Sequence, residues 1–408
     1  MARALVRYVD VEETLVAQTR RCDACGGADL VPFADLGEIP VLCGVHWGSA
    51  AEAAASPVGR MVLASCPDCA YVRNVAFDPA IMVYDTTMDT NLHHSPAFQA
   101  FSAELVKHLA TRYRLDGKRI LDVGCGQGEF LRELCHTAGC QGVGYDAMYA
   151  GPVGPDASGA TFHATPAPRG ADLPDFDMVT SRHWFEHIDD PYEFLVDLRE
   201  RAGDRPVYGY LEVPDACYDL STAGWEVIYP HVSYFDAYSL ALIAERAGWR
   251  IEDTGTFFSG MFRFIELSAN RESAPRLGSR PMPDSGDRDR QLAAVREFPD
   301  RHFAERAAWR ERIATLADAG ARPVLWGAGS RGVQFLTFAD PDRRLAAVVD
   351  VNPRKWGRYL PVTAHRVDAP DTLTDLAPTA VIVTNPAYRT EIAAHLDRLG
   401  VKADLLIA

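Results

Sequence analysis

The stretch Leu121-Asp122-Val123-Gly124-Cys125-Gly126-Gln127-Gly128-Glu129-Phe130 decides the fold of this chain. A short apolar strand, predicted over residues 119–123, runs into three glycines at alternate positions, and a helical pattern of apolar residues follows at once. Glycine permits a tight turn and lets the backbone approach a ligand where a Cβ atom would collide. A strand, a glycine turn and a helix in this order predict the first crossover of a nucleotide-binding α/β sheet.

Later segments continue the strand pattern and place an acid where a nucleotide ligand needs one. A second strand, predicted over residues 142–145, ends at Asp146, which can accept hydrogen bonds from both ribose hydroxyls of an adenosyl ligand. Residues 176–181 and 207–214 predict two further strands. A Ser259-Gly260 turn between two more apolar segments predicts an antiparallel hairpin at the end of the sheet.

The glycine spacing is not the G-x-G-x-x-G of dinucleotide enzymes. It resembles the loop of class I methyltransferases, which cradles the amino-acid half of S-adenosylmethionine, and the strand order over residues 98–270 is similar to that fold as well. The resemblance implies that Gly124, Gly126, Gly128 and Asp146 bind S-adenosylmethionine. Asp122 and His183 are two further cofactor-binding candidates. A tight turn in some other α/β protein is the alternative for the loop taken alone.

The composition indicates a soluble globular protein of more than one domain. At 408 residues the chain is too long for one ordinary core. No stretch approaches the roughly 20 apolar residues of a membrane span, and the N-terminal residues lack the long apolar core of a signal peptide. The net charge of −15 argues against nucleic acid as a partner, because phosphate binding needs a basic face. We expect a cytoplasmic protein with neither nucleic-acid nor membrane partners.

Four of the nine cysteines have the spacing of a metal site. They form two C-x-x-C knuckles, which can present four thiolates in the tetrahedron that a structural Zn²⁺ ion requires: Cys22, Cys25, Cys66 and Cys69. We therefore predict that these four residues bind zinc in a domain over residues 1–85, where the metal would supply folding energy to a segment too small for a full core. Reduced structural or redox thiols are the alternative.

The C-terminal part of the sequence opens a second α/β unit. Residues 276–286 have the composition of a linker, and a long amphipathic helix is predicted over residues 287–319, with a break near Pro299. A strand then meets Gly327-Ala328-Gly329-Ser330-Arg331-Gly332, which matches G-x-G-x-x-G, and the next strand ends at Asp350. Taken alone, this pattern indicates a dinucleotide site. Both glycine loops could bind a nucleotide, or one of them has the shape of a nucleotide-binding loop without binding a nucleotide.

The combination of units resembles one family more specifically than any single motif does. A two-knuckle zinc module (residues 1–85), a class I methyltransferase domain (86–275) and a C-terminal Rossmann-like domain (276–408) resemble the C-methyltransferases of deoxysugar biosynthesis, which act on nucleotide-linked keto-sugars in antibiotic pathways. Residues 35–40 and 350–361 are also similar to that family. The resemblance implies an α/β protein whose C-terminal domain encloses the substrate instead of binding a dinucleotide. The implied acceptor is a small molecule, with a nucleotide sugar as the candidate.

The resemblance also implies where the catalytic base lies. The family removes a proton beside a ketone, and the carbon of the resulting enolate attacks the sulfonium methyl group. Its base is a histidine shortly before a Ser-Tyr-Phe run, a position that His231 matches here. His187 in the Glu186-His187 pair is the second candidate base, and histidine titrates in a suitable range. Tyr229 is a third catalytic candidate: it could replace a tyrosine that the family has one position earlier, but only if the loop shifts.

The chain departs from the family where substrate and base would lie. Pro230 and Ile228 stand where the family has Glu and Tyr, and the tyrosine-rich segment at residues 84–95 is altered. We interpret this as methyl transfer to an altered acceptor. The alternative is N- or O-methylation of another small polar metabolite, such as an amino-acid-derived precursor, with Glu186 or Glu212 orienting the nucleophile. An inactive scaffold and a bifunctional dehydrogenase are further hypotheses, and the intact first glycine loop argues against the scaffold.

Overall fold

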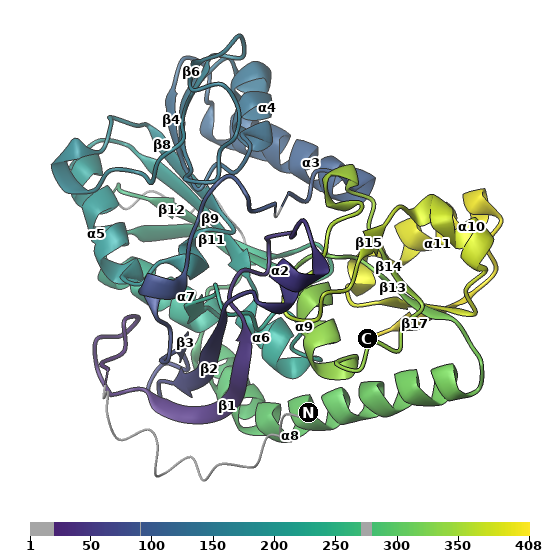
Figure 1. Ribbon diagram of the computed structural model, residues 1–408. Helices are drawn as coiled ribbons and strands as arrows, with labels where there is room; N and C mark the ends of the chain where they lie inside the picture. Colours follow the sequence, from purple (N-terminus) through teal and green to yellow (C-terminus); the bar gives the residue numbers. More distant parts are fainter. Residues whose placement is uncertain (1–19, 90, 271–279) are drawn as a thin grey trace.

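The structure is a computed structural model that describes residues 20–89, 91–270 and 280–408. Within this part of the chain the strands form three sheets, which we call the N-terminal module, the central domain and the C-terminal domain. Figure 1 shows the central domain at the upper left, the N-terminal module in purple below it, and the C-terminal domain in yellow at the right. Among the described helices, none combines the length and the apolar composition needed to cross a membrane.

The N-terminal module is a four-stranded antiparallel sheet in the order β1-β2-β3-β10. Three of its strands are consecutive in sequence: β1 (Val31–Pro40), β2 (Val58–Ser65) and β3 (Val72–Asn74). The fourth, β10 (Ser233–Tyr234), comes from the middle of the chain and pairs with β3. The sheet therefore does not close within the domain predicted over residues 1–85, of which the first 19 residues lie outside the described part. Short helices accompany the sheet: α2 (Ala50–Ala54) and η1 (Pro79–Ile81).

The central domain is an eight-stranded sheet in the order β11-β12-β9-β8-β4-β5-β7-β6. Its parallel strands are β4 (Arg119–Val123), β5 (Gln141–Tyr145), β7 (Ala160–His163), β8 (Met178–Arg182) and β9 (Tyr208–Pro214). The predicted hairpin is confirmed as the antiparallel pair β11 (Arg250–Phe257) and β12 (Phe262–Ser268), and the short β6 (Gly154–Pro155) closes the other edge. The strand order reverses between β4 and β8, which is where open α/β sheets bind ligands.

Helices connect these strands and cover the sheet. They are α3 (Pro96–Tyr113), α4 (Glu129–Ala138), α5 (Pro191–Ala202), α6 (Ala216–Ser221) and α7 (Ala237–Arg246), with the short η2 (Gly170–Asp172) and η3 (Phe185–His187). Helix α4 begins directly after the first glycine loop, so the strand–loop–helix unit predicted from residues 119–134 is confirmed.

The C-terminal domain is a five-stranded parallel sheet in the order β15-β14-β13-β16-β17. Its strands are β13 (Pro323–Trp326), β14 (Ala347–Val349), β15 (Val367–Asp368), β16 (Ala380–Val383) and β17 (Asp404–Ile407). Its helices are α9 (Ser330–Ala339), α10 (Leu373–Leu376) and α11 (Arg389–Leu399), with the short η4 (Pro353–Lys355), η5 (Pro370–Thr372) and η6 (Pro386–Tyr388). The boundary predicted between residues 275 and 276 lies outside the described residues.

One long helix, α8 (Ser285–Asp318), precedes the C-terminal sheet and runs along the bottom of the molecule in Figure 1. The break predicted near Pro299 is wrong, because Pro299 lies inside this continuous helix. Proline removes one backbone donor from a helix, and packing of the apolar face can offset that cost. Here Val295, Phe298 and Ile313 of α8 are buried against neighbouring units. Helix α8 thereby contributes to the cores of both the N-terminal module and the C-terminal domain.

Residues 222–236, which we call the junction segment, connect α6 to α7 and contribute to three apolar clusters. Tyr229 and Tyr234 pack with the N-terminal sheet, Trp225 and Ile228 pack with the C-terminal domain, and Phe235 packs in the main core of the central domain. Each of these five side chains is nearly fully buried. The three units therefore share one segment of chain, and this segment carries His231.

We predict that the contact between the module and the junction segment is tightly packed. A Cβ atom at Gly59 of β2 would lie 2.3 Å from the ring of Tyr229, so G59A should lower the free energy of unfolding by about 1–3 kcal/mol. The control is G48A, whose Cβ would meet only the ends of two side chains, Glu52 at 3.4 Å and Arg358 at 3.9 Å. Chemical denaturation measures both variants, and equal stability of G59A and the unchanged protein would contradict this packing.

Candidate functional site

The first glycine loop has a backbone that side chains would not tolerate. Gly124, Gly126 and Gly128 have φ angles of 76°, 56° and 83°, in the left-handed region that favours glycine. A Cβ atom at Gly124 would lie 2.3 Å from Trp184, and one at Gly128 would lie 2.5 Å from Phe162. A Cβ atom at Gly126 would meet no atom of the described chain within 4 Å. Gly124 and Gly128 thus permit close packing inside the protein, and Gly126 leaves open space in front of the loop.

Asp146 follows β5 and connects to this loop through its carboxylate. One oxygen accepts a hydrogen bond from the Gly126 amide at 2.8 Å, and the other accepts one from the Met148 amide at 2.7 Å. Burial raises the pKa of Asp146, and the two amides oppose that rise. A carboxylate has about four lone-pair positions, so two amides leave acceptor capacity for ribose hydroxyls. The open face at Gly126 and the acid beside it fit an adenosyl ligand.

The other two cofactor-binding candidates lie near the loop but have protein partners. Asp122, at the end of β4, accepts a hydrogen bond from the Thr180 hydroxyl of β8 at 2.7 Å, and burial raises its pKa to about 6. This contact joins the two strands between which the sheet order reverses. His183 has a left-handed backbone, with φ at 53°, and its Nε2 lies 3.0 Å from Glu212. The cofactor roles of Asp122 and His183 stay predictions.

The structure brings Glu186, His187 and His231 into one buried cluster. The first two lie in η3, directly after β8, and His231 lies in the junction segment. One carboxylate oxygen of Glu186 is 3.9 Å from Nε2 of His187 and 4.0 Å from Nε2 of His231. The two imidazole centroids are 5.0 Å apart. Residues separated widely in sequence therefore present one carboxyl and two imidazole groups to the same space.

A fourth residue, Tyr84, borders this cluster, and sequence reasoning did not assign it a role. Its hydroxyl lies 3.3 Å from Nδ1 of His187, which also lies 2.8 Å from the Pro230 carbonyl oxygen. A carbonyl oxygen only accepts, so Nδ1 of His187 carries the proton and Nε2 keeps its lone pair. The imidazole of His187 thereby holds the backbone immediately before His231. The altered tyrosine-rich segment was the signal that could have identified Tyr84.

Burial shifts the pKa of the carboxyl group and the pKa values of the two imidazoles in opposite directions. Glu186 is 2% exposed, and burial raises its pKa well above the ordinary value, with the charges of Glu226 and Glu212 adding to the effect. His231 is 5% exposed, and burial, followed by the charge of His187, lowers its pKa well below the ordinary value. Burial also lowers the pKa of His187 to about 4, although the Pro230 carbonyl opposes this. Burial therefore favours the neutral forms of all three groups: a carboxyl group that can donate a hydrogen bond and two imidazoles that can accept a proton.

The structure does not bring Tyr229 into this cluster. Its hydroxyl accepts a hydrogen bond from the Asp78 amide at 2.9 Å, and its ring packs on Phe77 with the centroids 5.5 Å apart. Tyr229 therefore anchors the junction segment to the N-terminal module. The loop shift that would bring its hydroxyl to the cluster is not observed, so the catalytic role predicted for Tyr229 is wrong.

Glu212, the second candidate for orienting a nucleophile, already has three protein partners. Its carboxylate lies 3.1 Å from Nε of Arg182 and 3.0 Å from Nε2 of His183, and it accepts a hydrogen bond from the Tyr210 hydroxyl at 2.7 Å. Burial alone would raise its pKa, but Arg182 and His183 lower it to about 2. Glu186 is the carboxyl group of the pair that is left free to meet a substrate.

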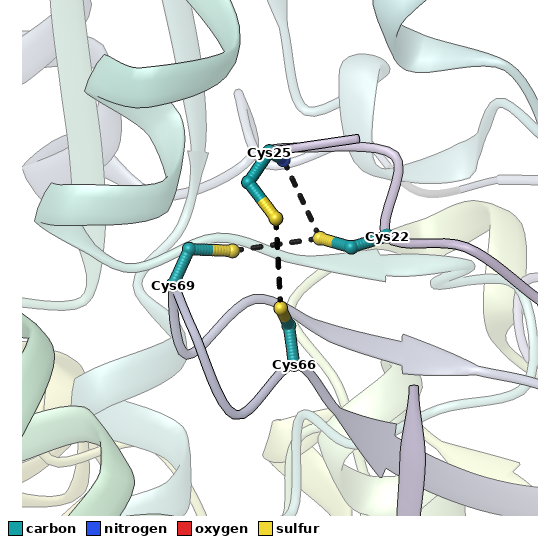
Figure 2. A group of neighbouring side chains, drawn as sticks. All are labelled: Cys22, Cys25, Cys66 and Cys69. Atoms are coloured by element: carbon teal, nitrogen blue, oxygen red, sulfur yellow. Dashed lines mark hydrogen bonds between the residues drawn. The ribbon is translucent and has the colours of Figure 1, made fainter. Parts of the chain in front are cut away.

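The four predicted cysteine ligands converge in the N-terminal module. Figure 2 shows their sulfur atoms directed toward one centre, from the loop before β1 and the turn between β2 and β3. The Cys22 and Cys69 sulfurs are 3.4 Å apart, the Cys25 and Cys66 sulfurs are 3.6 Å apart, and all four lie within 4.8 Å of one another. A Zn–S distance of about 2.3 Å in a tetrahedron gives S–S separations of about 3.8 Å. The cluster has the donor set and the spacing for a metal ion.

The second glycine loop repeats the acid–amide contacts of the first, but only Gly327 of its three glycines has a positive φ. Asp350 accepts hydrogen bonds from the Ala328 amide at 2.7 Å and the Asn352 amide at 2.8 Å, as Asp146 does from its own two amides. Asp350 also binds the Lys355 ammonium group at 3.0 Å, and His46 of the N-terminal module contacts the Ala328 carbonyl at 3.1 Å. Lysine thus neutralises the acid that would otherwise receive a ribose.

Comparisons with known proteins agree with this arrangement. Residues 93–254 match a family described as a methyltransferase domain, and residues 284–404 match one described as a C-methyltransferase C-terminal domain. None of the curated protein sequences matches the chain. The match over residues 93–254, together with the strand order, confirms the class I α/β fold that the glycine loop predicts for the central domain.

Solved structures with similarity to the chain include three methyltransferases. An S-adenosylmethionine-dependent methyltransferase from Mesorhizobium loti is 17% identical, with a TM-score of 0.31 over 38% of this chain and 92% of its own. Magnesium protoporphyrin IX methyltransferase from Synechocystis PCC 6803 is 19% identical, with a TM-score of 0.33 over 42% and 83%. Human N-acetylserotonin methyltransferase is 13% identical, with a TM-score of 0.34 over 42% and 54%.

We predict that only the first of the two loop acids binds the cofactor. D146N should weaken binding of S-adenosylhomocysteine at least about tenfold, because a carboxylate acceptor of the ribose hydroxyls is lost. D350N is the matched control: it should leave that affinity unchanged and lower the melting temperature, because Lys355 loses its ion pair. Titration calorimetry and thermal unfolding test both variants. Weaker binding in D350N with normal binding in D146N would contradict the assignment.

Proposed function

We propose that this chain, an S-adenosylmethionine-dependent methyltransferase with a C-methyltransferase C-terminal domain, methylates a carbon beside the ketone of a nucleotide-linked keto-deoxysugar. One observation carries the proposal. Both carboxyl oxygens of Glu186 and Nδ1 of His231 are buried and have no hydrogen-bond partner within the described chain. A buried polar atom without a partner costs about 1–3 kcal/mol, so a cluster of them supports a site that a polar substrate completes.

The pKa shifts assign opposite roles to the two groups. His231 is neutral near pH 7 because burial lowers its pKa, so a ring nitrogen can accept a proton. Burial raises the pKa of Glu186 and so favours its protonated form, whose carboxyl group can donate a hydrogen bond. Two titratable groups with pKa values pushed in opposite directions are the arrangement that acid–base chemistry at one substrate requires.

Each residue then has a defined task in the reaction. His231 takes the proton from the carbon beside the ketone and becomes an imidazolium. The C–H electron pair forms the C=C bond of the enolate, and the π pair of the carbonyl group moves to its oxygen. Glu186 donates a hydrogen bond to that oxygen as its negative charge develops, a contribution of about 10²–10³-fold for one well-placed donor. S-adenosylmethionine, when bound at the first glycine loop, supplies the electrophilic methyl group. The burial of the cluster excludes water, which strengthens these interactions.

We also propose that the four-cysteine cluster binds a structural Zn²⁺ ion. Four thiolates close the coordination shell, so the ion would have no open position for catalysis. It would join the loop before β1 to the turn between β2 and β3. Strand β3 pairs with β10 of the junction segment, so this turn supports the segment that carries His231. The free cysteines at all four positions support the proposal.

A second candidate function is N- or O-methylation of another small polar metabolite. The replacement of the family's Glu and Tyr by Pro230 and Ile228 favours it, because these positions adjoin the base. Under this alternative the unpartnered carboxyl group of Glu186 would orient an amine or a hydroxyl.

We predict that His231 controls proton removal. In D2O with S-adenosylhomocysteine, the enzyme should exchange the proton beside the ketone of a nucleotide keto-sugar, followed by NMR. H231A should slow this exchange at least about 10²-fold, and E186A should slow it by a similar factor, because base and donor contributions have that size. H136A, at an exposed position on α4, is the control. Lost methylation with intact exchange in H231A would remove His231 as the base. Binding of S-adenosylhomocysteine without binding of any nucleotide sugar would favour the second function.

We predict one zinc ion per chain. Inductively coupled plasma mass spectrometry should find it in the purified protein, and C25S/C66S should lose it and melt at a lower temperature. C43S is the control, because the Cys43 thiol is buried elsewhere and donates to the Pro40 carbonyl oxygen at 3.3 Å. A Cys22–Cys69 disulfide found by peptide mass spectrometry, without metal, would support the redox alternative instead.

A further inference from the structure

Arg331 belongs to the second glycine loop, yet it binds residues of the central domain. It lies in the first turn of α9, and its side chain is 11% exposed. Its guanidinium group binds the Glu226 carboxylate through Nε and lies 3.3 Å from the Asp219 carboxylate through Nη2. A third donor, Nη1, reaches the Thr384 carbonyl oxygen in its own domain at 3.3 Å. One side chain therefore connects the C-terminal domain to α6 and to the junction segment.

These carboxylates take the place of a dinucleotide as the anionic partner of the loop. In a dinucleotide domain the pyrophosphate lies at the N-terminus of the helix after the glycines, and the acid of the next strand binds a ribose. Here the arginine at that helix start binds Glu226 and Asp219, and Lys355 binds the acid Asp350. Both anion-binding features of the fold are thus used within the chain.

Two more contacts of α9 hold the same stretch of the junction segment. The Gln334 side chain donates a hydrogen bond to the Val227 carbonyl oxygen, and Phe335 packs edge-to-face on Trp225 with the centroids 5.2 Å apart. Gln334 and Trp225 are each about 1% exposed. Arg331, Gln334 and Phe335 together fix residues 225–227, which precede His231 by four to six positions in the junction segment.

The charge of Arg331 reaches the cluster itself. Burial and the neighbouring histidines lower the pKa of His231, the Glu226 backbone opposes this, and Arg331 lowers the pKa further. Glu226, the main partner of Arg331, raises the pKa of Glu186. The ion pair therefore lies within electrostatic range of both groups.

We propose that Arg331 is a positioning residue: its ion pair with Glu226 and its hydrogen bond to Asp219 fix the junction segment so that His231 stays beside Glu186. The proposal rests on the proposed role of His231. It gives the G-x-G-x-x-G motif a mechanical task in this chain, because the loop presents the arginine that connects the C-terminal domain to the proton-transfer cluster.

The test removes the ion pair and measures position separately from cofactor binding. R331M leaves the Glu226 carboxylate unpaired, so R331M/E226Q, which removes both charges, serves if the single variant fails to fold. R310M is the matched control, because Arg310 forms an exposed ion pair with Asp342 in the same part of the chain. The readouts are amide hydrogen exchange of residues 222–236, calorimetric affinity for S-adenosylhomocysteine, and kcat and KM with the acceptor found by the exchange assay above.

We expect R331M/E226Q to exchange the amides of residues 222–236 at least about tenfold faster, with unchanged exchange in residues 119–145. The value of kcat should fall about 10²-fold, while KM for S-adenosylmethionine and the affinity for S-adenosylhomocysteine stay within about twofold, because misplacing a catalytic group by about 1 Å has that effect. Unchanged exchange in residues 222–236, or an unchanged kcat, would overturn the proposal. Failure of the unaltered protein to bind S-adenosylhomocysteine would instead overturn the proposed function.

Discussion

The junction segment is the constraint on which the rest of the structure depends. It cannot move relative to one unit without breaking contacts with the other two. Tyr229 binds the Asp78 amide in the N-terminal module, β10 pairs with β3, and Arg331 of the C-terminal domain holds Glu226. Leaving any of these buried groups without its partner would lower the free energy of unfolding of the protein. Three sheets built from distant parts of the sequence thus act as one frame around His231.

The two glycine loops show how one local geometry can serve two purposes. Asp146 and Asp350 each accept a loop amide and the amide two residues later, although all three glycines of the first loop have positive φ and only Gly327 of the second does. The side-chain partners of the two loops also differ. Asp350 also binds Lys355, and the arginine of its loop binds carboxylates, whereas Asp146 keeps acceptor capacity beside the open face at Gly126. The loop with the better dinucleotide consensus is therefore the one whose anion-binding groups are already used.

The features that could be predicted from the sequence depend on local sequence patterns. The contacts that could not be predicted join residues far apart in the sequence. The tight glycine turn, the strands around β4 and the convergence of four cysteines could be predicted, because short motifs with fixed spacing mark each of them. The role of Tyr229 was wrong because its partner, Asp78, is 151 positions away. Arg331 was read only as part of a motif, since nothing periodic links it to Glu226, 105 positions away. The break at Pro299 was wrong because packing of α8 outweighs a local penalty.

The most direct test of the account is a crystal structure of the protein with S-adenosylhomocysteine. We predict the amino-acid part of the ligand over residues 124–128, the ribose hydroxyls on Asp146, and the sulfur atom facing the space between Glu186 and His231. Ligand density at residues 327–332, or a sulfur atom that faces away from His231, would contradict it.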